Sequence, residues 1–339
     1  MGKETTTSRI TFHVCNCEQY PLVHGSFRVS GMNVLPEVFS LWAALQILKE
    51  RPNRPRRLRG GFNFVKYPFS VIIHGLNMIF LGVKIDSLNL SQSRQKAGEF
   101  LNSAGQYKIF TPNPEMIVKA QKDEYFKKVL NEGDLNLCDG FGLSLFSGAP
   151  RVTGVDFMLK LCALAQEQGR SIYLLGSGKD EVVKKTADEL IKKFPNLKIA
   201  GYDKGPVISE NILGCHSERS EESLSGGQNK RTEILRYAQD DNALQKINST
   251  GAEILFAAFG MGKQEKWIAE NLPKMPGVKI AVGVGGAFDY ISGVLPRAPG
   301  FMRAIGLEWM YRLIKQPGRL PRIFNATVKF IYLILKNKI

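Results

Sequence analysis

Along residues 78–300 the chain alternates short apolar runs with segments whose apolar residues recur at helical spacing. Each apolar run predicts a strand, and these runs cover residues 78–86, 107–110, 135–138, 171–175, 197–200, 252–259 and 279–284. The helical patterns between them cover residues 91–104, 116–125, 156–168, 180–194 and 243–249. Strands that alternate with helices predict a Rossmann-like α/β fold, a parallel sheet with helices on both faces.

Polar residues directly follow two of the predicted strands. The run at 107–110 ends at Thr111-Pro112-Asn113-Pro114, where two prolines exclude both a helix interior and a central strand. The run at 135–138 ends at Asp139-Gly140. Parallel sheets place ligands at the carboxyl ends of their strands, so Asp139 is the best candidate for a catalytic carboxylate. The alternative is an aspartate that caps a helix or stabilises a turn before glycine.

Glycine-rich turns follow two other strands. Gly176-Ser177-Gly178 lies between a predicted strand and a predicted helix, whose N-terminus could hold a phosphate. It has neither the Walker ending nor the full GxGxxG pattern. Gly285-Gly286 follows the strand at 279–284, and glycines there let a ligand approach the backbone closely. For both turns the alternative is tight strand–helix packing.

Residues 1–77 differ from the rest of the chain. They are polar and contain a dense basic tract at 51–59, with one short helical pattern at 34–48. We interpret them as a poorly structured leader and expect translation to start at Met78. The alternative is that the basic tract binds nucleic acid.

A second unusual segment, residues 214–241, interrupts the α/β pattern. It is highly polar, carries mixed charge and has almost no apolar periodicity, so it cannot supply a core face. We predict a surface insertion without a catalytic role; a regulatory loop is the alternative.

The C-terminal residues change character again. Helical patterns at 301–313 and 322–338 are rich in aromatic and aliphatic residues, are edged by Arg and Lys, and are separated by Pro317 and Pro321. Basic amphipathic helices of this kind bind membrane interfaces. The alternative is that they pack on their own domain or on another subunit. No apolar run in the sequence is long enough to cross a bilayer.

Charge and cysteine content narrow the class of ligand. The formal net charge is +15, which favours an acidic partner: nucleic acid, nucleotide phosphates or an anionic membrane. The five cysteines form no CxxC pair and the four histidines no ligand-spaced cluster, so we expect no protein-bound metal. Cys138 and Cys162 lie in apolar segments and are expected in the core, as in a protein of a reducing compartment.

Seven motifs, in order, give the sequence a specific resemblance. They are TPNPEM, LCDGFG, RVTGVD, YLLGSG, FGMGKQEKW, VGGAFDYISG and RAPGFMRAIGLEWMYRL. From about Met78 to Arg322, with residues 214–241 as an insertion, the chain resembles the WecG/TagA/CpsF glycosyltransferase family. The resemblance implies an α/β glycosyltransferase domain at 78–300 and a C-terminal helical membrane-docking appendage at 301–339.

The resemblance also implies an activity. It is the transfer, with inversion and without a metal or other cofactor, of an N-acetylmannosamine-type sugar from a UDP donor. The acceptor is an undecaprenyl-diphosphate-linked N-acetylglucosamine used for teichoic acid or a similar polymer. The enzyme would lie at the inner face of the plasma membrane and bind no nucleic acid; whether it forms a homo-oligomer stays open. The runner-up is a nucleotide-binding regulatory module without transfer activity.

Individual positions match the family's site residues. The catalytic base aligns with Asp139, and its donor-side partners align with Thr111 and Asn113. Further substrate-binding positions are Gln264 and Asp289, and we add the turn glycines Gly176 and Gly286. Appendage residues that close over the site align with Arg312, Arg319 and Arg322.

Two positions depart from the family pattern. Gly262 stands where many relatives have proline, and Gln316 stands before Pro317 where glutamate is usual.

The chemistry agrees with these assignments. Inverting transfer needs a carboxylate to accept the proton of the acceptor hydroxyl. It also needs positive groups or N–H donors around the leaving diphosphate. Because no DxD-like pair follows a strand, we expect arginines and helix N-termini to supply that charge.

Overall fold

The computed structural model describes residues 9–12, 25–28, 73–74, 77–206, 208, 241–304 and 306–337. The chain divides into two compact units, residues 1–64 and 65–339. In the first unit, β1 (Arg9–Phe12) pairs antiparallel with β2 (Gly25–Arg28). The predicted helix at 34–48, the basic tract at 51–59 and nearly all of the predicted insertion lie outside the described residues. The start at Met78 and the three-part division stay predictions.

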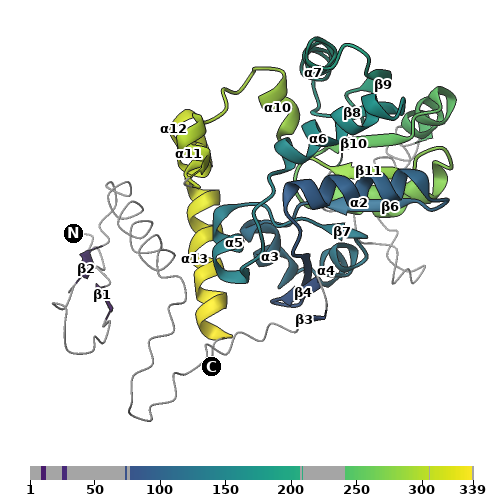
Figure 1. Cartoon of the computed structure of the whole chain (residues 1–339). Coiled ribbons are helices and arrows are strands. Elements are labelled where there is room, and N and C mark those ends of the chain that lie inside the picture. Colours follow the sequence, from purple (N-terminus) through teal and green to yellow (C-terminus); the bar gives the residue numbers. More distant parts are fainter. Residues whose placement is uncertain are drawn as a thin grey trace, which may run out of the picture. The chain divides into compact units, whose positions relative to one another are not determined.

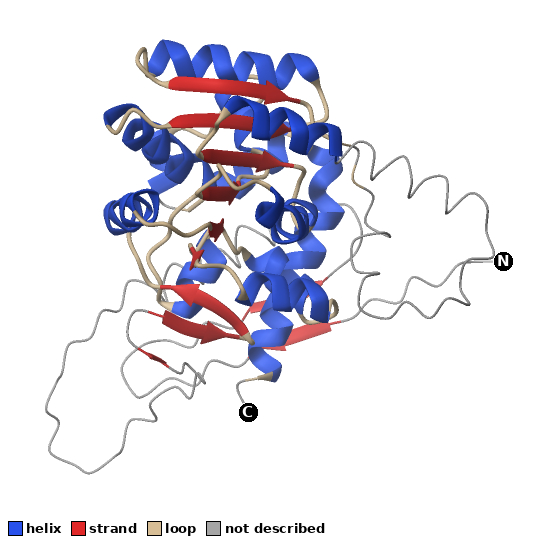
Figure 2. Cartoon of the chain, turned by 90° about the vertical axis from the view of Figure 1, so that its right-hand side faces the viewer, coloured by secondary structure: helices blue, strands red, loops and turns tan. Residues whose placement is uncertain are grey.

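The second unit is built on a parallel sheet of six strands, which form a single layer between helices (Figure 2). Their order is β7-β6-β11-β10-β8-β9, and every pair is parallel. The strands are β6 (Tyr107–Phe110), β7 (Leu135–Asn136), β8 (Ser171–Gly176), β9 (Lys198–Asp203), β10 (Ile254–Ala258) and β11 (Ile280–Gly283). This sheet confirms the predicted α/β fold.

Both faces of the central strands are buried, because alternate residues of these strands enter two different cores. In β8, Ile172 and Leu174 belong to one core, whereas Tyr173 and Leu175 belong to the other. The strands therefore appear in the sequence as continuous apolar runs.

Each core is closed by its own set of helices (Figure 1). The first is covered by α2 (Leu90–Asn102), α6 (Gly154–Glu167), α7 (Asp180–Lys193) and α10 (Ala287–Ile291). The second is covered by α3 (Pro114–Ala120), α4 (Glu124–Asn131), α5 (Phe141–Ser147), the helical residues 241–250, α9 (Lys263–Asn271), η2 (Leu272–Lys274) and α13 (Leu320–Lys336).

The prediction of a single strand at 78–86 is wrong. The segment is a hairpin of β4 (Asn77–Phe80) and β5 (Val83–Asp86), and β3 (Ile73–His74) pairs with β4 on the other side. Leu81 and Gly82 form the turn, with φ angles of 50° and 78°. Two consecutive positive φ angles define the tight turn that matches strand twist. Asp86 forms a parallel bridge with Leu137, so this small sheet joins the β7 edge.

The C-terminal region is helical, but with a different division. The helix predicted at 301–313 is two helices, α11 (Gly300–Ala304) and α12 (Glu308–Lys315), because Gly306 adopts a φ of 81° between them. Then η3 (Pro317–Arg319) leads into α13, which packs on α3 and lies beside α5 (Figure 1). Within the described residues, no helix has the length and apolar character needed to cross a bilayer.

The inner face of α13 is part of the second core. Phe330 is 2% exposed, and its ring centroid lies 6.0 Å from that of Phe80 and 6.1 Å from that of Phe146. Ile334, one turn later, is also buried. This helix therefore does pack on its own domain, which leaves only its outer face for another partner.

Candidate active site

Three strand tips meet on one edge of the sheet. β7, β6 and β11 are neighbours in the sheet. From β6 the chain continues to β7 on one side, whereas β11, on the other side of β6, is the last strand of a series that arrives from β10. Such a reversal of direction is where open parallel sheets bind ligands. A cavity of about 250 Å³ lies there, lined among others by Asp139, Gly154, Gly286, Glu308 and Arg312.

Asp139 is fixed by backbone contacts on both sides. Its N–H donates to the carbonyl of Pro112 over 2.8 Å, which ties the end of β7 to the end of β6. Burial and, after it, the negative charge of Glu308 raise the pKa of the Asp139 carboxyl to about 6. Backbone N–H groups of Gly154 and Gly140 and the charge of Arg151 act in the opposite direction. A carboxylate with this pKa is suited to accept a proton near neutral pH.

Thr111 meets Asp139 at the start of α6. Thr153 caps that helix, its Oγ1 accepting from the N–H of Asp156 over 3.2 Å. The next residue, Gly154, donates its N–H to Asp139, and a Cβ at Gly154 would lie 3.5 Å from Oγ1 of Thr111. The glycine therefore lets the loops after β6 and β7 and the first turn of α6 approach closely.

Asn113 has a structural role at the same edge. Its Oδ1 accepts from the N–H of Met116 over 3.0 Å and caps α3, with Pro114 in the first turn. A Cβ at Gly140 would lie 3.2 Å from Cδ of Pro114, so the cap also packs against the loop that carries Asp139. The amide oxygen of Asn113 is occupied by this cap.

Gln264 holds the loop after β11 in place. Its Oε1 accepts from the N–H of Gly285 over 2.9 Å, and its Nε2 donates to Oε1 of Glu265 over 2.8 Å. The other oxygen of Glu265 accepts from the N–H of Gly262 over 2.7 Å. Burial raises the pKa of Glu265 to about 7. Gln264 is itself buried, so it supports Gly286 from behind the cavity wall.

Arg312 enters the cavity from α12. A Cβ at Gly286 would lie 2.8 Å from Nη2 of Arg312 and 3.7 Å from Oδ2 of Asp289, so these three residues are close neighbours. The Cζ of Arg312 lies 5.3 Å from the ring centroid of Tyr290. Its Nε is buried and has no hydrogen-bond partner among the residues that the structure describes. This donor is available to an anionic ligand.

For three of the predicted site residues, no contact in the described part of the chain places them at this cavity. Gly176 ends β8, which β10 separates from β11, and a Cβ there would lie 2.7 Å from the carbonyl carbon of Ala258. Tight packing between strands thus accounts for this glycine. Arg319 lies in η3 and Arg322 in α13, but their side chains are not among those that the structure describes.

Both departures from the family pattern affect local geometry. Gly262 has a φ of 85°, which the proline ring cannot adopt. A relative with proline at this position therefore cannot have the same loop conformation. Gln316 has a buried Oε1 that accepts no hydrogen bond from the described part of the chain.

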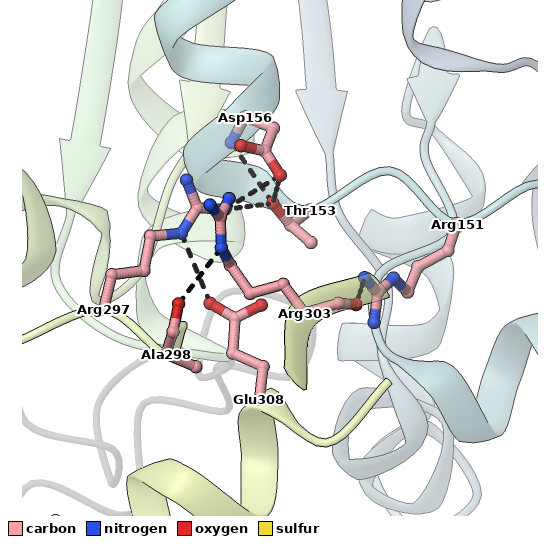
Figure 3. A network of polar contacts seen from close by, with 7 residues as sticks. All are labelled: Arg151, Thr153, Asp156, Arg297, Ala298, Arg303 and Glu308. Atoms are coloured by element: carbon pink, nitrogen blue, oxygen red, sulfur yellow. Dashed lines mark hydrogen bonds and ion pairs between the residues drawn. The ribbon is translucent and has the colours of Figure 1, made fainter. Parts of the chain in front are cut away.

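A polar network that sequence reasoning missed fastens the C-terminal segment to the cavity rim (Figure 3). Arg297 forms ion pairs with Asp156 at 2.8 Å and with Glu308 at 3.5 Å. Its Nη2 also donates to Oγ1 of Thr153 over 3.3 Å. Arg151 donates to the carbonyl of Arg303. These residues lie within or beside the RVTGVD and RAPGFMRAIGLEW motifs. The motifs therefore marked this region in the sequence, but they did not indicate that its residues pair with one another.

Among the described residues, no three His, Cys, Asp or Glu side chains are grouped as metal ligands would be. Cys138 and Cys162 are free and buried, as predicted.

The fold and cavity define an α/β protein that places a carboxylate and an arginine at the reversal point of a parallel sheet. Comparison with known proteins gives the family: the model described as "Glycosyl transferase WecG/TagA/CpsF family" matches residues 78–339. The chain belongs to this family and is a glycosyltransferase. The alternative of a regulatory module without transfer activity is therefore not supported.

Two relatives are similar over most of their length. One, from Bacillus subtilis (strain 168), is 30% identical over 237 residues, which are 68% of this chain and 79% of the relative. Another, from Staphylococcus aureus (strain MW2), is 24% identical over 266 residues, 76% of this chain and 92% of the relative. Each is named N-acetylglucosaminyldiphosphoundecaprenol N-acetyl-beta-D-mannosaminyltransferase.

Proposed function

We propose that this enzyme transfers an N-acetylmannosamine-type sugar from UDP to undecaprenyl-diphosphate-linked N-acetylglucosamine, with inversion and without a metal ion. The names of its relatives support the transferred sugar and the lipid-linked acceptor. The observation that carries the mechanism is Asp139, a carboxylate with a pKa of about 6 fixed at the cavity.

In the proposed reaction, ionised Asp139 accepts the proton of the acceptor hydroxyl. The hydroxyl oxygen attacks the anomeric carbon of the donor from the side opposite UDP. The bond from that carbon to the diphosphate oxygen breaks, and UDP leaves with the electron pair. One attack from the opposite face inverts the anomeric configuration.

The leaving diphosphate needs positive charge, which Arg312 is positioned to supply. Its buried Nε lacks a hydrogen-bond partner among the described residues, and the missing side chain of Gly286 lets the guanidinium approach the loop after β11. Hydrogen bonds to charged groups are among the strongest that a protein makes. We assign Arg319 and Arg322 the same task once substrate is bound. Thr111, Asn113, Gln264 and Asp289 would shape the donor site.

The outer face of α13 supports a membrane-associated enzyme at the inner face of the plasma membrane. Its exposed apolar residues are Phe324, Val328, Tyr332 and Leu335. They recur at intervals of three and four and therefore form one stripe along the helix, which we call the α13 stripe. Lys329 and Lys336 are exposed beside it. An apolar stripe edged by lysines suits an anionic bilayer surface, where the lipid-linked acceptor resides.

The test is a transfer assay with a lipid-diphosphate-linked N-acetylglucosamine acceptor and a panel of UDP-sugars, in the presence of a metal chelator. We expect a product only with N-acetylmannosamine or its close derivatives, with the anomeric configuration inverted. Transfer of another sugar class, retention of configuration, or loss of activity with chelator would overturn the corresponding part of the proposal.

A further inference from the structure

A second and larger cavity lies between α3, the loop that follows β10, and α13. Its volume is about 630 Å³. Its charged lining residues are Glu115, Lys119, Lys122, Lys263 and Lys329. Four lysines against one glutamate leave a net charge of three positive units. We call this the lysine cavity.

The lysines come from separate elements, so local sequence does not explain their convergence. Lys119 lies in the last turn of α3 and Lys122 in the turn that follows it, Lys263 begins α9, and Lys329 lies on α13. Lysines favour the C-terminal ends of helices, but that preference does not account for Lys263 or Lys329. No carboxylate in the described part of the chain pairs with Lys122, Lys263 or Lys329.

The floor of the cavity leaves backbone open to a ligand. Gly260, in the loop after β10, has a φ of 89°, and a Cβ there would meet no described residue within 4 Å. Lys119 is held differently from the other lysines: its Nζ lies 5.7 Å from the ring centroid of Phe126. The apolar part of the lining comes from Val118, Phe259 and Met261.

The lysine cavity adjoins the catalytic cavity along α13. Ile323 lines the catalytic cavity, whereas Ala326 and Lys329 line the lysine cavity. At 1.5 Å per residue, Ala326 and Lys329 lie about 4.5 Å and 9 Å further along the helix axis. This offset is comparable to the span of one sugar ring.

The lysine cavity also adjoins the α13 stripe. At 100° per residue, Lys329 falls between the stripe residue Val328 and Ala326 around the helix. Moving around α13, one therefore passes from the exposed apolar stripe to Lys329 and then into the lysine cavity.

We infer that the lysine cavity binds the diphosphate of the lipid-linked acceptor, an inference that rests on the proposed function. The terminal sugar extends from it toward Asp139, and the lipid chain leaves along the α13 stripe. A diphosphate diester carries two negative charges, which the net positive charge of the cavity complements. Lysine ammonium groups bind phosphate as point charges, without the fixed geometry of arginine.

The first test neutralises the three lysines without a carboxylate partner, as Lys122→Gln/Lys263→Gln/Lys329→Gln. At saturating UDP-sugar, we expect the KM for the acceptor to rise by about tenfold or more, because each lost phosphate contact weakens binding. The KM for the UDP-sugar should stay unchanged. The matched control is Lys184→Gln/Lys185→Gln, which removes two exposed charges from α7 on the opposite face of the sheet. An unchanged acceptor KM in a folded triple variant overturns the inference.

The second test measures binding without turnover, so it holds even if no transfer is found. Farnesyl diphosphate should raise the melting temperature of the wild-type protein but not of the triple variant, and farnesol should raise neither. If the triple variant loses a shift produced by UDP instead, the cavity binds the donor and the inference fails. If it loses only binding to phosphatidylglycerol vesicles, while farnesyl diphosphate still binds, the lysines act on the bilayer surface and the inference also fails.

Discussion

The two cavities along α13 hold their charges in different ways. In the catalytic cavity, Asp139 is bonded to backbone amides, and Glu308 is paired with Arg297. In the lysine cavity, three of the four lysines have no carboxylate partner among the described residues. Chemistry requires groups held in one geometry, whereas recognition of a flexible lipid diphosphate tolerates mobile charges. The comparison predicts that changes in the first cavity act on kcat and changes in the second on KM.

The largest effect should come from Asp139→Asn. We expect kcat to fall about 1,000-fold, since the amide cannot accept the proton. A stopped or continuous transfer assay measures this, and turnover near the wild-type rate would remove Asp139 from the mechanism.

The same variant should be more stable than wild type at neutral pH. The pKa of Asp139 is about 6 in the folded protein, against an ordinary value of 3.8, so the native state binds the proton more tightly. Stability therefore falls as pH rises from about 4 through 6, and an uncharged asparagine avoids a loss of about 1 to 3 kcal/mol. Thermal melts at pH 4 and pH 7 measure this: the two proteins should converge at the lower pH. A variant less stable than wild type at both pH values would contradict the proposed cause of the raised pKa.

Arg312→Ala should have the next largest effect. Loss of a group that stabilises developing charge should lower kcat about 100-fold. Arg312→Lys should restore only part of it, because lysine lacks the planar fork. The control is Lys315→Gln, one turn away on α12 and exposed. If Arg312→Ala raised only the KM for the lipid acceptor, the two cavities would have been assigned in reverse.

A smaller effect should follow from polar substitutions in the α13 stripe. For Val328→Ser/Tyr332→Ser we expect co-sedimentation with phosphatidylglycerol vesicles to weaken by about tenfold, because less apolar area is buried in the interface. Turnover of a detergent-solubilised acceptor should be unchanged. Ile191→Ser is the matched control, since Ile191 is exposed on α7. Equal vesicle binding by both variants would exclude the stripe from membrane contact.

The smallest effect should be a change of pH profile in Glu308→Gln. The charge of Glu308 raises the pKa of Asp139, while Arg151 lowers it and Arg297 and Arg312 lie nearby. Removing the negative charge should move the acid limb of kcat/KM to lower pH by about half a unit to one unit. Glu181→Gln, exposed on α7, should leave the profile unchanged. A shift to higher pH would contradict the coupling.

Local pattern was enough to predict most strands and the position of Asp139. The runs at 107–110 and 135–138 end where their polar residues begin, and both become neighbouring strands. Gly176 had an equally strong local signal, a strand followed by a glycine turn and a helix. What separates the two is strand order, which places β10 between β8 and β11 and is not encoded in any short segment.

Long-range contacts were beyond sequence reasoning for a related reason. Arg297 pairs with Asp156 and with Glu308, although about 150 residues of sequence separate Asp156 from the other two. No rule of sequence spacing relates positions so far apart. The turn at Leu81-Gly82 was missed because a leucine with positive φ is uncommon. Gly306 looked like an ordinary helix residue, although its φ of 81° ends one helix and starts another.

The most direct measurement is a crystal structure of the enzyme with an unreactive UDP-sugar analogue. The account predicts the diphosphate beside Arg312 and the anomeric carbon facing the Asp139 carboxylate, within the cavity at the tips of β7, β6 and β11. A nucleotide sugar bound instead at the Gly176-Ser177-Gly178 turn, beyond β10, would contradict it.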